Sequence, residues 1–256
     1  ITSYKSMTIK IGQIPYLNSE VFYRGMDTSV AELSPLVPSA LSGAVQNGQV
    51  EAGPVPLVTY FAIEDRFKPL GSYCIATVER AYSILFYSRV PIEDLNGKIV
   101  GITSETSTSV RLLKTLLKHR FNVNPSKYEM VRDSNDSFLL IGDEALRNRL
   151  GVAGYPYQYD LGEVWYQWTG LPFVFARWVV RNDLDQRCIE WIETALDLNI
   201  SRNLVEANQI AKKRRDLGMS LDEVAEYVRS FRYKLGPEEL KSIDKFRDLL
   251  ALEDAF

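Results

Sequence analysis

The stretch that decides the fold runs from Lys98 to Lys118 and reads KIVGITSETSTSVRLLKTLLK. Its first part, through Thr103, is a short β-branched run that predicts a buried strand. From residue 110 onward, apolar residues recur at helical spacing with basic residues between them, which predicts an amphipathic helix. The stretch therefore predicts a strand that runs directly into a helix, which is the building unit of an α/β fold.

Small hydroxyl residues fill the turn between this strand and helix, among them Thr106 and Ser107. A helix N-terminus gathers free backbone N–H groups and the positive end of the helix dipole, and hydroxyls add further donors. Thr106 and Ser107 are therefore candidates for binding a carboxylate or phosphate. The alternative is that they only cap the helix, and the stretch alone favours that structural role.

The composition describes an ordinary soluble protein of 256 residues, with 46% apolar and 25% charged residues. Its net charge of −3 argues against non-specific nucleic-acid binding. No window holds the roughly 18 consecutive apolar residues of a membrane span, and no signal peptide is visible. Cys74 and Cys188 are isolated from other metal-ligand residues, so neither a zinc site nor a disulfide framework is indicated. We expect a cytoplasmic protein with neither nucleic acid nor membrane as partner.

Three further residues could face a ligand. Asn18 follows an alternating strand pattern over residues 7–14, and the carboxyl end of a strand is where open α/β sheets place ligands. Ser39 begins a short helical pattern as a natural N-cap and is a second candidate anion contact. Ser83 lies in a strongly apolar strand over 82–88 and could face a cleft. The structural alternatives are a turn or cap role for Asn18 and a small core residue for Ser83.

Strand and helix patterns alternate along the rest of the chain, which implies a mostly parallel sheet. Further strands are predicted at 50–58, 128–131, 137–142 and 173–180, and helices at 183–198, 203–216, 220–231 and 237–252. Two long strands bracket a compact strand-helix segment. We therefore predict a discontinuous first domain of residues 7–89 and 174–256, a second domain of residues 90–173 inserted into it, and a ligand cleft between them.

Several motifs resemble one family. They are Gly12-x-Ile-x-Tyr-Leu-Asn18, Ser104-x-Thr-Ser107, Ile141-Gly-Asp-x-Ala-Leu146, Tyr159-Asp-Leu-Gly162 with Trp165, and Thr169-Gly-Leu-Pro-Phe-Val-Phe-Ala176 with Trp178. With these motifs the sequence resembles chorismate dehydratase, the first enzyme of the futalosine route to menaquinone. The resemblance departs at Pro15, where the family commonly has Ser, and over residues 78–83, which replace a turn richer in Gly and Ser.

The resemblance implies a type II periplasmic-binding-protein-like fold, an α/β fold with two domains around a cleft, joined by two crossing strands. It also implies a lyase that removes water from chorismate to give 3-[(1-carboxyvinyl)oxy]benzoate without a metal or organic cofactor. Chorismate carries two carboxylates, so Thr106 and Ser107 are assigned to one of them and Ser39 to the other. Ser83 is a further candidate contact.

A catalytic base is not obvious in the sequence. The single histidine, His119, lies about 18 Å from the start of its helix. Asn18 cannot deprotonate carbon, so we assign it to orienting the substrate, whose own enolpyruvyl carboxylate would take the proton. Asp143 and Asp160 are alternative acids or bases for which structural roles are favoured. Arg177, in an apolar strand, is expected to have a buried ion-pair partner.

Two other functions remain open at this point. One is a solute-binding or ligand-sensing protein for a small carboxylate, which would have the same fold and no chemistry. The other is the sister enzyme of the pathway, 1,4-dihydroxy-6-naphthoate synthase, whose Cys-containing N-terminal motif is absent from this sequence. The sequence leaves a homodimer open as well.

Overall fold

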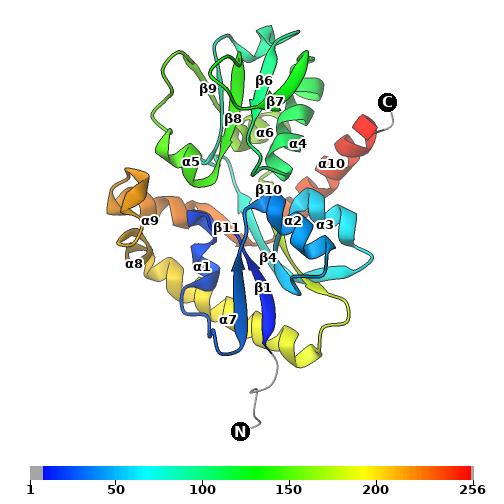
Figure 1. The fold of residues 1–256 in the computed structure, drawn as a ribbon, viewed down its shortest axis with the longest axis vertical. Helices are drawn as coiled ribbons and strands as arrows, with labels where there is room; N and C mark the ends of the chain where they lie inside the picture. The colour runs from blue at the N-terminus through cyan, green and yellow to red at the C-terminus, as the bar shows by residue number, and fades with distance from the viewer. Residues whose placement is uncertain (1–7, 255–256) are drawn as a thin grey trace. The chain divides into compact units, whose positions relative to one another are not determined.

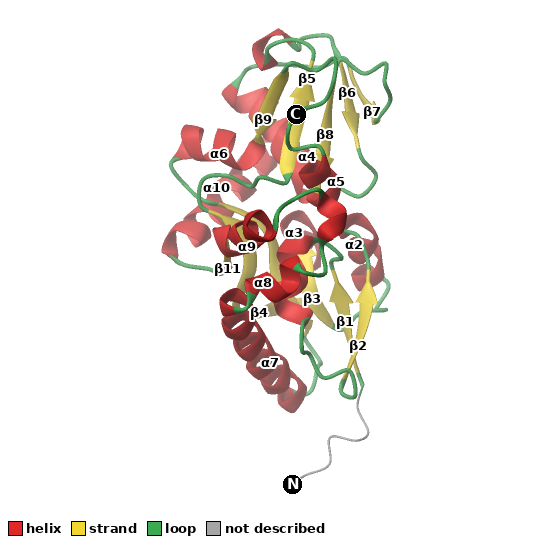
Figure 2. Ribbon diagram, turned by 90° about the vertical axis from the view of Figure 1, so that its left-hand side faces the viewer, coloured by secondary structure: helices red, strands yellow, loops and turns green. Residues whose placement is uncertain are grey.

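The computed structural model describes residues 8–254 and has an α/β fold with two mixed β-sheets (Figure 1). The strands are β1 (Ile9–Gln13), β2 (Ala31–Pro35), β3 (Ala52–Pro56), β4 (Phe67–Thr77), β5 (Ile84–Ser88), β6 (Ile99–Ile102), β7 (Lys127–Met130), β8 (Ser137–Ile141), β9 (Tyr157–Asp160), β10 (Phe173–Arg181) and β11 (Phe231–Lys234). Figure 2 shows the strands of each sheet side by side, with helices packed around them.

The helices alternate with these strands along most of the chain. The α-helices are α1 (Glu20–Tyr23), α2 (Pro38–Gln46), α3 (Leu57–Ile63), α4 (Thr108–Thr115), α5 (Gly142–Arg147), α6 (Leu161–Thr169), α7 (Gln186–Val205), α8 (Ala207–Ala211), α9 (Leu221–Ser230) and α10 (Pro237–Asp254). The short 3₁₀ and π turns are η1 (Leu17–Ser19), η2 (Ile92–Asp94), η3 (Leu116–Arg120) and η4 (Arg215–Leu217). None of the helices within residues 8–254 is long and apolar enough to cross a membrane.

The chain divides into two compact units. Within residues 8–254, unit 1 comprises the chain up to Ile75 together with Phe175–Lys234, and unit 2 comprises Ala76–Val174 and the chain from Leu235 onward. The strand order is β11-β4-β10-β3-β1-β2 in the sheet of unit 1, which we call sheet A. It is β7-β6-β8-β5-β9 in the sheet of unit 2, which we call sheet B. The chain passes between the units within β4 and within β10, and once more before α10.

Each sheet has a parallel core bordered by an antiparallel strand. In sheet A, β1 pairs in parallel with β2 and β3, and β10 runs antiparallel to β3. In sheet B, β6 pairs in parallel with β7 and β8, and β5 runs antiparallel to β8. The carboxyl ends of parallel strands meet at one edge of a sheet, so each unit has one edge where polar side chains that follow its strands can gather.

The division differs from the predicted one in two places, because residues 76–89, which include β5, and the C-terminal helix α10 both belong to unit 2. The rings of Trp165, Phe173 and Phe246 pack edge to face, with centroids 5.0 to 5.9 Å apart. The indole Nε1 of Trp165 also donates to Ser242 Oγ of α10 at 3.1 Å. The burial of three aromatic rings holds α10 against α6. This contact joins residues far apart in sequence, so periodicity alone gave no sign of it.

Several strands are additions to the sequence prediction. The edge strand β2 contains a proline, β4 is mixed in polarity, and β9 and β11 are only four residues long. After residue 180 the sequence predicted four helices and no strand, which was wrong, because β11 follows α9 directly. Tyr233 of β11 lies edge to face with Phe22, at 5.4 Å between ring centroids, and this long-range aromatic packing outweighs local helix propensity.

Candidate functional site

Asn18 lies at the carboxyl edge of sheet A, in η1, which follows β1 after a short break. Its side chain is half-buried, and its Oδ1 accepts a hydrogen bond from Ser19 Oγ at 3.3 Å. The Nδ2 group of Asn18 has no partner among residues 8–254. The amide is therefore oriented from one side and free to donate two hydrogen bonds to a ligand.

The short helix α1, which begins directly after Asn18 and Ser19, is held in place by α7. Asn199 donates to the carbonyl of Phe22, and Asn203 donates to that of Val21, both at 2.8 Å. Asn199 and Asn203 are almost fully buried and replace the hydrogen bonds that a four-residue helix cannot make internally. The position of Asn18 thus depends on two amides that the sequence analysis missed. Asn199 fell between two predicted helices and Asn203 at the start of the second, whereas α7 runs unbroken through both positions.

Ser39 lies at the same edge of sheet A, in the first turn of α2, which follows β2. The prediction that Ser39 caps this helix was wrong. Val37 occupies the N-cap position without a side-chain hydrogen bond, and Pro38 takes the first helical turn, where its fixed φ and missing N–H are tolerated. The hydroxyl of Ser39 has no hydrogen-bond partner within the described chain and remains available to a ligand.

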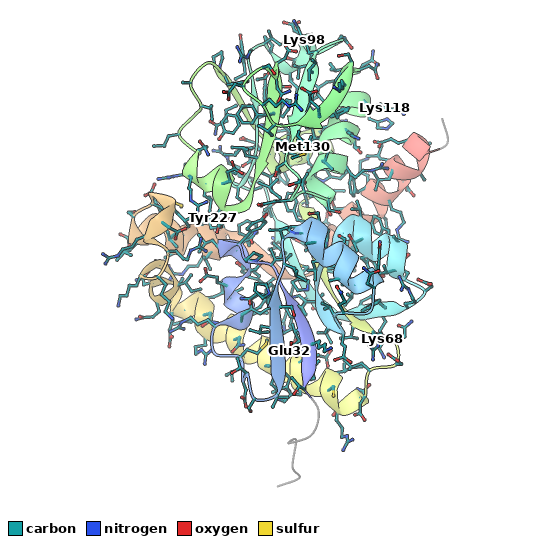
Figure 3. All side chains as sticks on the ribbon, viewed as in Figure 1. Glu32, Lys68, Lys98, Lys118, Met130 and Tyr227 are labelled. Carbon is teal, nitrogen blue, oxygen red and sulfur yellow. The ribbon has the colours of Figure 1, made fainter. Side chains whose placement is uncertain are left out.

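Ser83, Thr106 and Ser107 all lie at the carboxyl edge of sheet B. Thr106 and Ser107 follow β6, whereas Ser83 precedes the antiparallel strand β5. Because β8 separates β6 from β5, the two positions are about 10 Å apart across the sheet. Figure 3 labels Lys98, at the amino end of β6, and Met130, at the carboxyl end of the parallel neighbour β7.

The hydroxyl residues at the start of α4 have different roles. Thr106 Oγ1 accepts from the backbone N–H of Val110 at 3.2 Å, so this side chain satisfies one orphan donor of the first helical turn. Ser107 occupies the N-cap position, yet its side chain makes no capping hydrogen bond. Ser107 is consequently the freer of the two candidates, while Thr106 combines a capping role with a hydroxyl proton that it can still donate.

Ser83 is only 1% exposed, and its Oγ donates to the carbonyl of Ala81 at 3.2 Å. Its backbone carbonyl accepts from Gly142, which links the start of β5 to the end of β8. This burial favours the structural alternative for the Ser83 hydroxyl. The neighbouring residue Tyr82 is exposed and has φ = +59°, an uncommon value for a residue other than glycine.

A single buried carboxylate, that of Asp160, fixes the segment from Val78 to Ser83, which we call the 78–83 loop. Asp160 accepts from the backbone N–H groups of Ala81 at 3.0 Å and Tyr82 at 2.6 Å. It also caps α6 by accepting from residues 162 and 163. Burial raises the pKa of the Asp160 carboxyl above its usual value, against the backbone amides and Arg80, which act to lower it. With its oxygens committed to four amides, Asp160 has a structural role.

The glycine of the Tyr159-Asp-Leu-Gly162 motif lets the 78–83 loop approach α6. A Cβ at Gly162 would lie 3.0 Å from the backbone nitrogen of Ala81 and 3.1 Å from Thr77 Oγ1. Both distances are shorter than ordinary van der Waals contacts, and the neighbours are buried. The motif therefore fixes the 78–83 loop in two ways. The carboxylate of Asp160 binds the backbone amides of the loop, and Gly162 leaves room for the loop to pack against α6.

We expect Gly162→Ala to reduce the free energy of unfolding by about 1–3 kcal/mol, because the loop must move to accommodate the methyl group. The matched control is Gly43→Ala in α2, where a Cβ would meet no atom within 4 Å. That change should be neutral or stabilise the protein by up to about 1 kcal/mol through helix propensity. Urea unfolding followed by tryptophan fluorescence measures both variants. An unchanged stability of Gly162→Ala would show that the close approach is not needed.

The prediction of a buried ion-pair partner for Arg177 was wrong, because no carboxylate within residues 8–254 forms an ion pair with it. Its guanidinium carbon lies 5.1 Å from the ring centroid of Tyr60, and its Nε is buried without a hydrogen-bond partner. The stacking on Tyr60 partly compensates the charge in place of the expected ion pair. The apolar strand around Arg177 was the feature that could have identified it as a functional residue.

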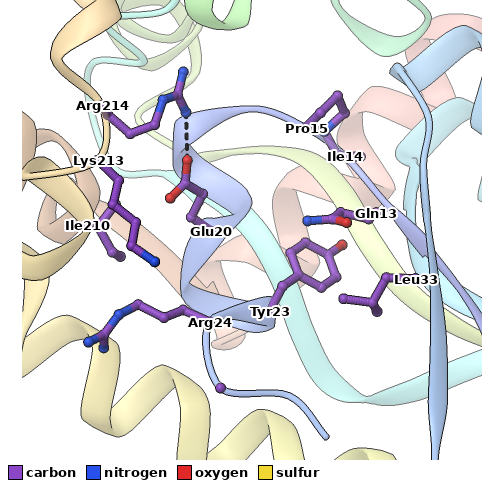
Figure 4. A pocket seen from close by; sticks show the side chains of 11 residues that line it. Gln13, Ile14, Pro15, Glu20, Tyr23, Arg24, Leu33, Ile210, Lys213 and Arg214 are labelled. Atoms are coloured by element: carbon purple, nitrogen blue, oxygen red, sulfur yellow. Dashed lines mark hydrogen bonds and ion pairs between the residues drawn. The ribbon is translucent and has the colours of Figure 1, made fainter. Parts of the chain in front are cut away.

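A cavity of about 520 Å³ lies within unit 1, beside the carboxyl end of β1 (Figure 4). Its lining residues come from β1, α1, β2 and the segment of α8 and the turn after it: Gln13, Ile14, Pro15, Glu20, Tyr23, Arg24, Gly25, Leu33, Ile210, Lys213 and Arg214. Arg214 and Glu20 form an ion pair at 2.6 Å across it. None of the predicted site residues lines this cavity. It borders the Pro15 turn that precedes Asn18.

The described residues hold no group of three or more His, Cys, Asp or Glu side chains arranged to bind a metal ion. His119 faces α10, with its Nε2 3.6 Å from Glu253 Oε1. The candidate ligand-binding groups described above are an amide, hydroxyls and a guanidinium. Such a set can bind and orient an anionic ligand by hydrogen bonds.

Comparison with known structures identifies the fold. The chain is similar to a protein of Archaeoglobus fulgidus, with a TM-score of 0.79 at 17% identity, covering 98% of this chain and 99% of the other. It is also similar to the periplasmic aliphatic sulphonate binding protein SsuA of Escherichia coli, with a TM-score of 0.65 at 12% identity, covering 97% of this chain and 88% of the other. The predicted periplasmic-binding-protein-like α/β fold is confirmed.

Sequence comparison identifies the family. Chorismate dehydratase of Thermus thermophilus is 27% identical over 237 residues, which is 84% of this chain and 85% of that protein. The family model described as menaquinone biosynthesis matches residues 9–252, nearly the whole chain. The matched residues include those at both sheet edges and the Asp160 motif that holds the 78–83 loop in place. The chain belongs to the menaquinone biosynthesis family.

Proposed function

We propose that this protein is a chorismate dehydratase, a lyase that converts chorismate to 3-[(1-carboxyvinyl)oxy]benzoate in the futalosine pathway of menaquinone biosynthesis. The observation that carries the proposal is the Asn18 amide at the carboxyl edge of sheet A, oriented by Ser19 and free to donate. Membership of the menaquinone biosynthesis family and the likeness to the Thermus thermophilus enzyme support the same reaction. The substrate is a small molecule, and the reaction takes place in the cytoplasm.

Substrate binding in this proposal uses hydrogen-bond donors. Thr106 and Ser107, with the backbone N–H groups that open α4, bind one carboxylate of chorismate. Ser39 contacts the other carboxylate. Ser83 is the weakest of the proposed contacts, since its hydroxyl is buried and bonded to Ala81. A hydrogen bond to a charged group contributes about 1.5–3 kcal/mol, so a few such contacts suffice for a micromolar to millimolar complex.

The reaction removes a ring hydrogen and the hydroxyl on the neighbouring ring carbon. The C–H bond breaks first, and its electron pair is delocalised toward the ring carboxylate, to which this position is vinylogous. The enolpyruvyl carboxylate of the substrate takes the proton, while Asn18 donates to the substrate and holds this carboxylate close to it. The enolpyruvyl carboxyl group then gives this proton to the departing hydroxyl, the C–O bond breaks, water leaves and the ring becomes aromatic. The gain of aromaticity supplies the driving force, so positioning is the main catalytic task.

The decisive experiment for the reaction class is incubation of the protein with chorismate, with products separated and identified by mass. The proposal predicts one product that has lost one water molecule and has the absorbance of a substituted benzoate. A solute-binding protein would raise its melting temperature with chorismate and leave the compound intact. The sister enzyme of the pathway would leave chorismate unchanged and bind 1,4-dihydroxy-6-naphthoate instead, which a parallel thermal-shift measurement detects.

A further inference from the structure

Arg177 is a charged residue without a counter-ion in the described part of the chain. It stands in β10 between Ala176 and Trp178, which are 4% and 0% exposed, and is itself half-buried. The Nε–H is buried and donates to no acceptor, and the guanidinium only stacks on Tyr60. A buried N–H donor without an acceptor is costly to the folded protein. A ligand that accepts from this N–H group would remove that cost.

The register of the strands places Arg177 at the carboxyl edge of sheet A, where Asn18 also lies. Arg177 pairs with Val55, the next-to-last residue of β3. Tyr60 lies in the first turn of α3, which begins directly where β3 ends. Trp178, on the opposite face of β10, packs instead against Phe22 of α1, at 5.3 Å between ring centroids. The guanidinium is therefore on the α3 face of sheet A, close to the end of β3.

The same face carries Ser39. The hydroxyls of Ser42 in α2 and Thr59 in α3 are 2.6 Å apart, so the two helices are joined beside Tyr60. Ser39 precedes Ser42 by three residues, which places both on one side of α2, one turn apart. An unpaired cation and an unpaired hydroxyl thus occur on adjoining elements at one edge of unit 1.

We propose that Arg177 binds a carboxylate of the substrate and that, together with Ser39, it forms the second carboxylate site. This inference rests on the proposed function, because chorismate is a dianion and the other donors assigned to it are uncharged. The guanidinium presents a planar fork that matches a carboxylate and is more weakly hydrated than an ammonium group. Stacking on Tyr60 fixes its plane before the ligand arrives, which reduces the entropy lost on binding.

The test compares Arg177→Gln, Arg177→Lys and Arg177→Met with the wild-type protein. Loss of a charged hydrogen bond predicts a KM for chorismate about 10- to 100-fold higher in Arg177→Gln, with kcat within a few-fold. Arg177→Lys should recover part of the affinity because it keeps the charge. Arg177→Met should unfold at the same temperature as the wild type or higher, because it removes an unpaired charge from an apolar strand. A purely structural arginine would instead make Arg177→Met less stable.

The matched control is Arg181→Gln, four residues along the same strand. Arg181 already pairs with Glu51 at 3.2 Å and with Asp183, so its loss should leave KM unchanged. A wild-type KM in Arg177→Gln would overturn the inference and leave the proposed reaction intact.

A direct binding measurement separates this inference from the reaction. Calorimetric titration of each variant with benzene-1,3-dicarboxylate, an unreactive aromatic dianion, should show weaker binding to Arg177→Gln than to Arg181→Gln. If the wild-type protein leaves chorismate intact but this difference is present, the reaction is wrong and the carboxylate site stands. If the two variants bind the dicarboxylate equally, the carboxylate site is wrong.

Discussion

Replacing Asp160 by alanine is expected to lower the free energy of unfolding by about 3–5 kcal/mol, a larger loss than that expected for Gly162→Ala at the same loop. The Asp160 carboxylate accepts four backbone hydrogen bonds, from the 78–83 loop on one side and from the start of α6 on the other. Alanine leaves these buried donors unpaired, and each unpaired donor costs about 1–3 kcal/mol before the loop relaxes. The strained backbone of Tyr82 then has nothing to hold it.

Urea unfolding measured by far-ultraviolet circular dichroism and tryptophan fluorescence tests this prediction. Asp160→Asn should lie between the wild type and Asp160→Ala, because the amide keeps one acceptor oxygen. Glu163→Ala is the control: the Glu163 carboxylate faces the exposed Arg80, at 3.6 Å, so its loss should cost less than about 1 kcal/mol. A stability of Asp160→Ala within about 1 kcal/mol of the wild type would contradict the structural role of Asp160.

Replacing Asn18 by alanine is expected to lower kcat for chorismate by about 100- to 1,000-fold, the range seen when one preorganised donor is removed from an active site. Stability should change by less than about 1 kcal/mol, because the only protein partner of the amide in the described residues is the Ser19 hydroxyl. The effect should appear mainly in kcat, since the carboxylate contacts that bind chorismate remain.

Steady-state kinetics of Asn18→Ala and of Asn47→Ala measure this effect against a matched control. Asn47 is exposed at the end of α2, and its change should leave kcat unchanged. Near-normal turnover by a folded Asn18→Ala enzyme would remove Asn18 from the mechanism.

The parts of the fold that the sequence predicted are those with a strong local pattern. The strand-turn-helix unit from Lys98 to Lys118 is present as β6 and α4 because β-branched and amphipathic periodicities are local properties. The strands at residues 84–88, 137–141 and 173–181 were predicted for the same reason. By contrast, β4 and β11 depend on neighbours far away in the chain, and the placement of α10 depends on an aromatic contact with Trp165.

For the candidate site, too, the sequence predicted local features and missed those that depend on tertiary contacts. Asn18, Thr106 and Ser107 could be selected from sequence because each follows a recognisable strand, and the strand ends place them at sheet edges. The hydrogen-bond partners of each side chain could not be predicted from such local patterns. Whether Arg177 has a counter-ion, whether Ser83 is buried and which amides Asp160 binds depend on tertiary contacts, and the sequence-based role of Arg177 failed at this point.

The measurement that tests the proposed activity most directly is a progress curve with chorismate in large molar excess over the purified protein and no added cofactor. We predict conversion of many substrate molecules per protein molecule, with loss of the cyclohexadiene absorbance and stoichiometric appearance of 3-[(1-carboxyvinyl)oxy]benzoate. Chorismate that stays intact in the presence of demonstrably folded protein would contradict the proposed dehydratase activity.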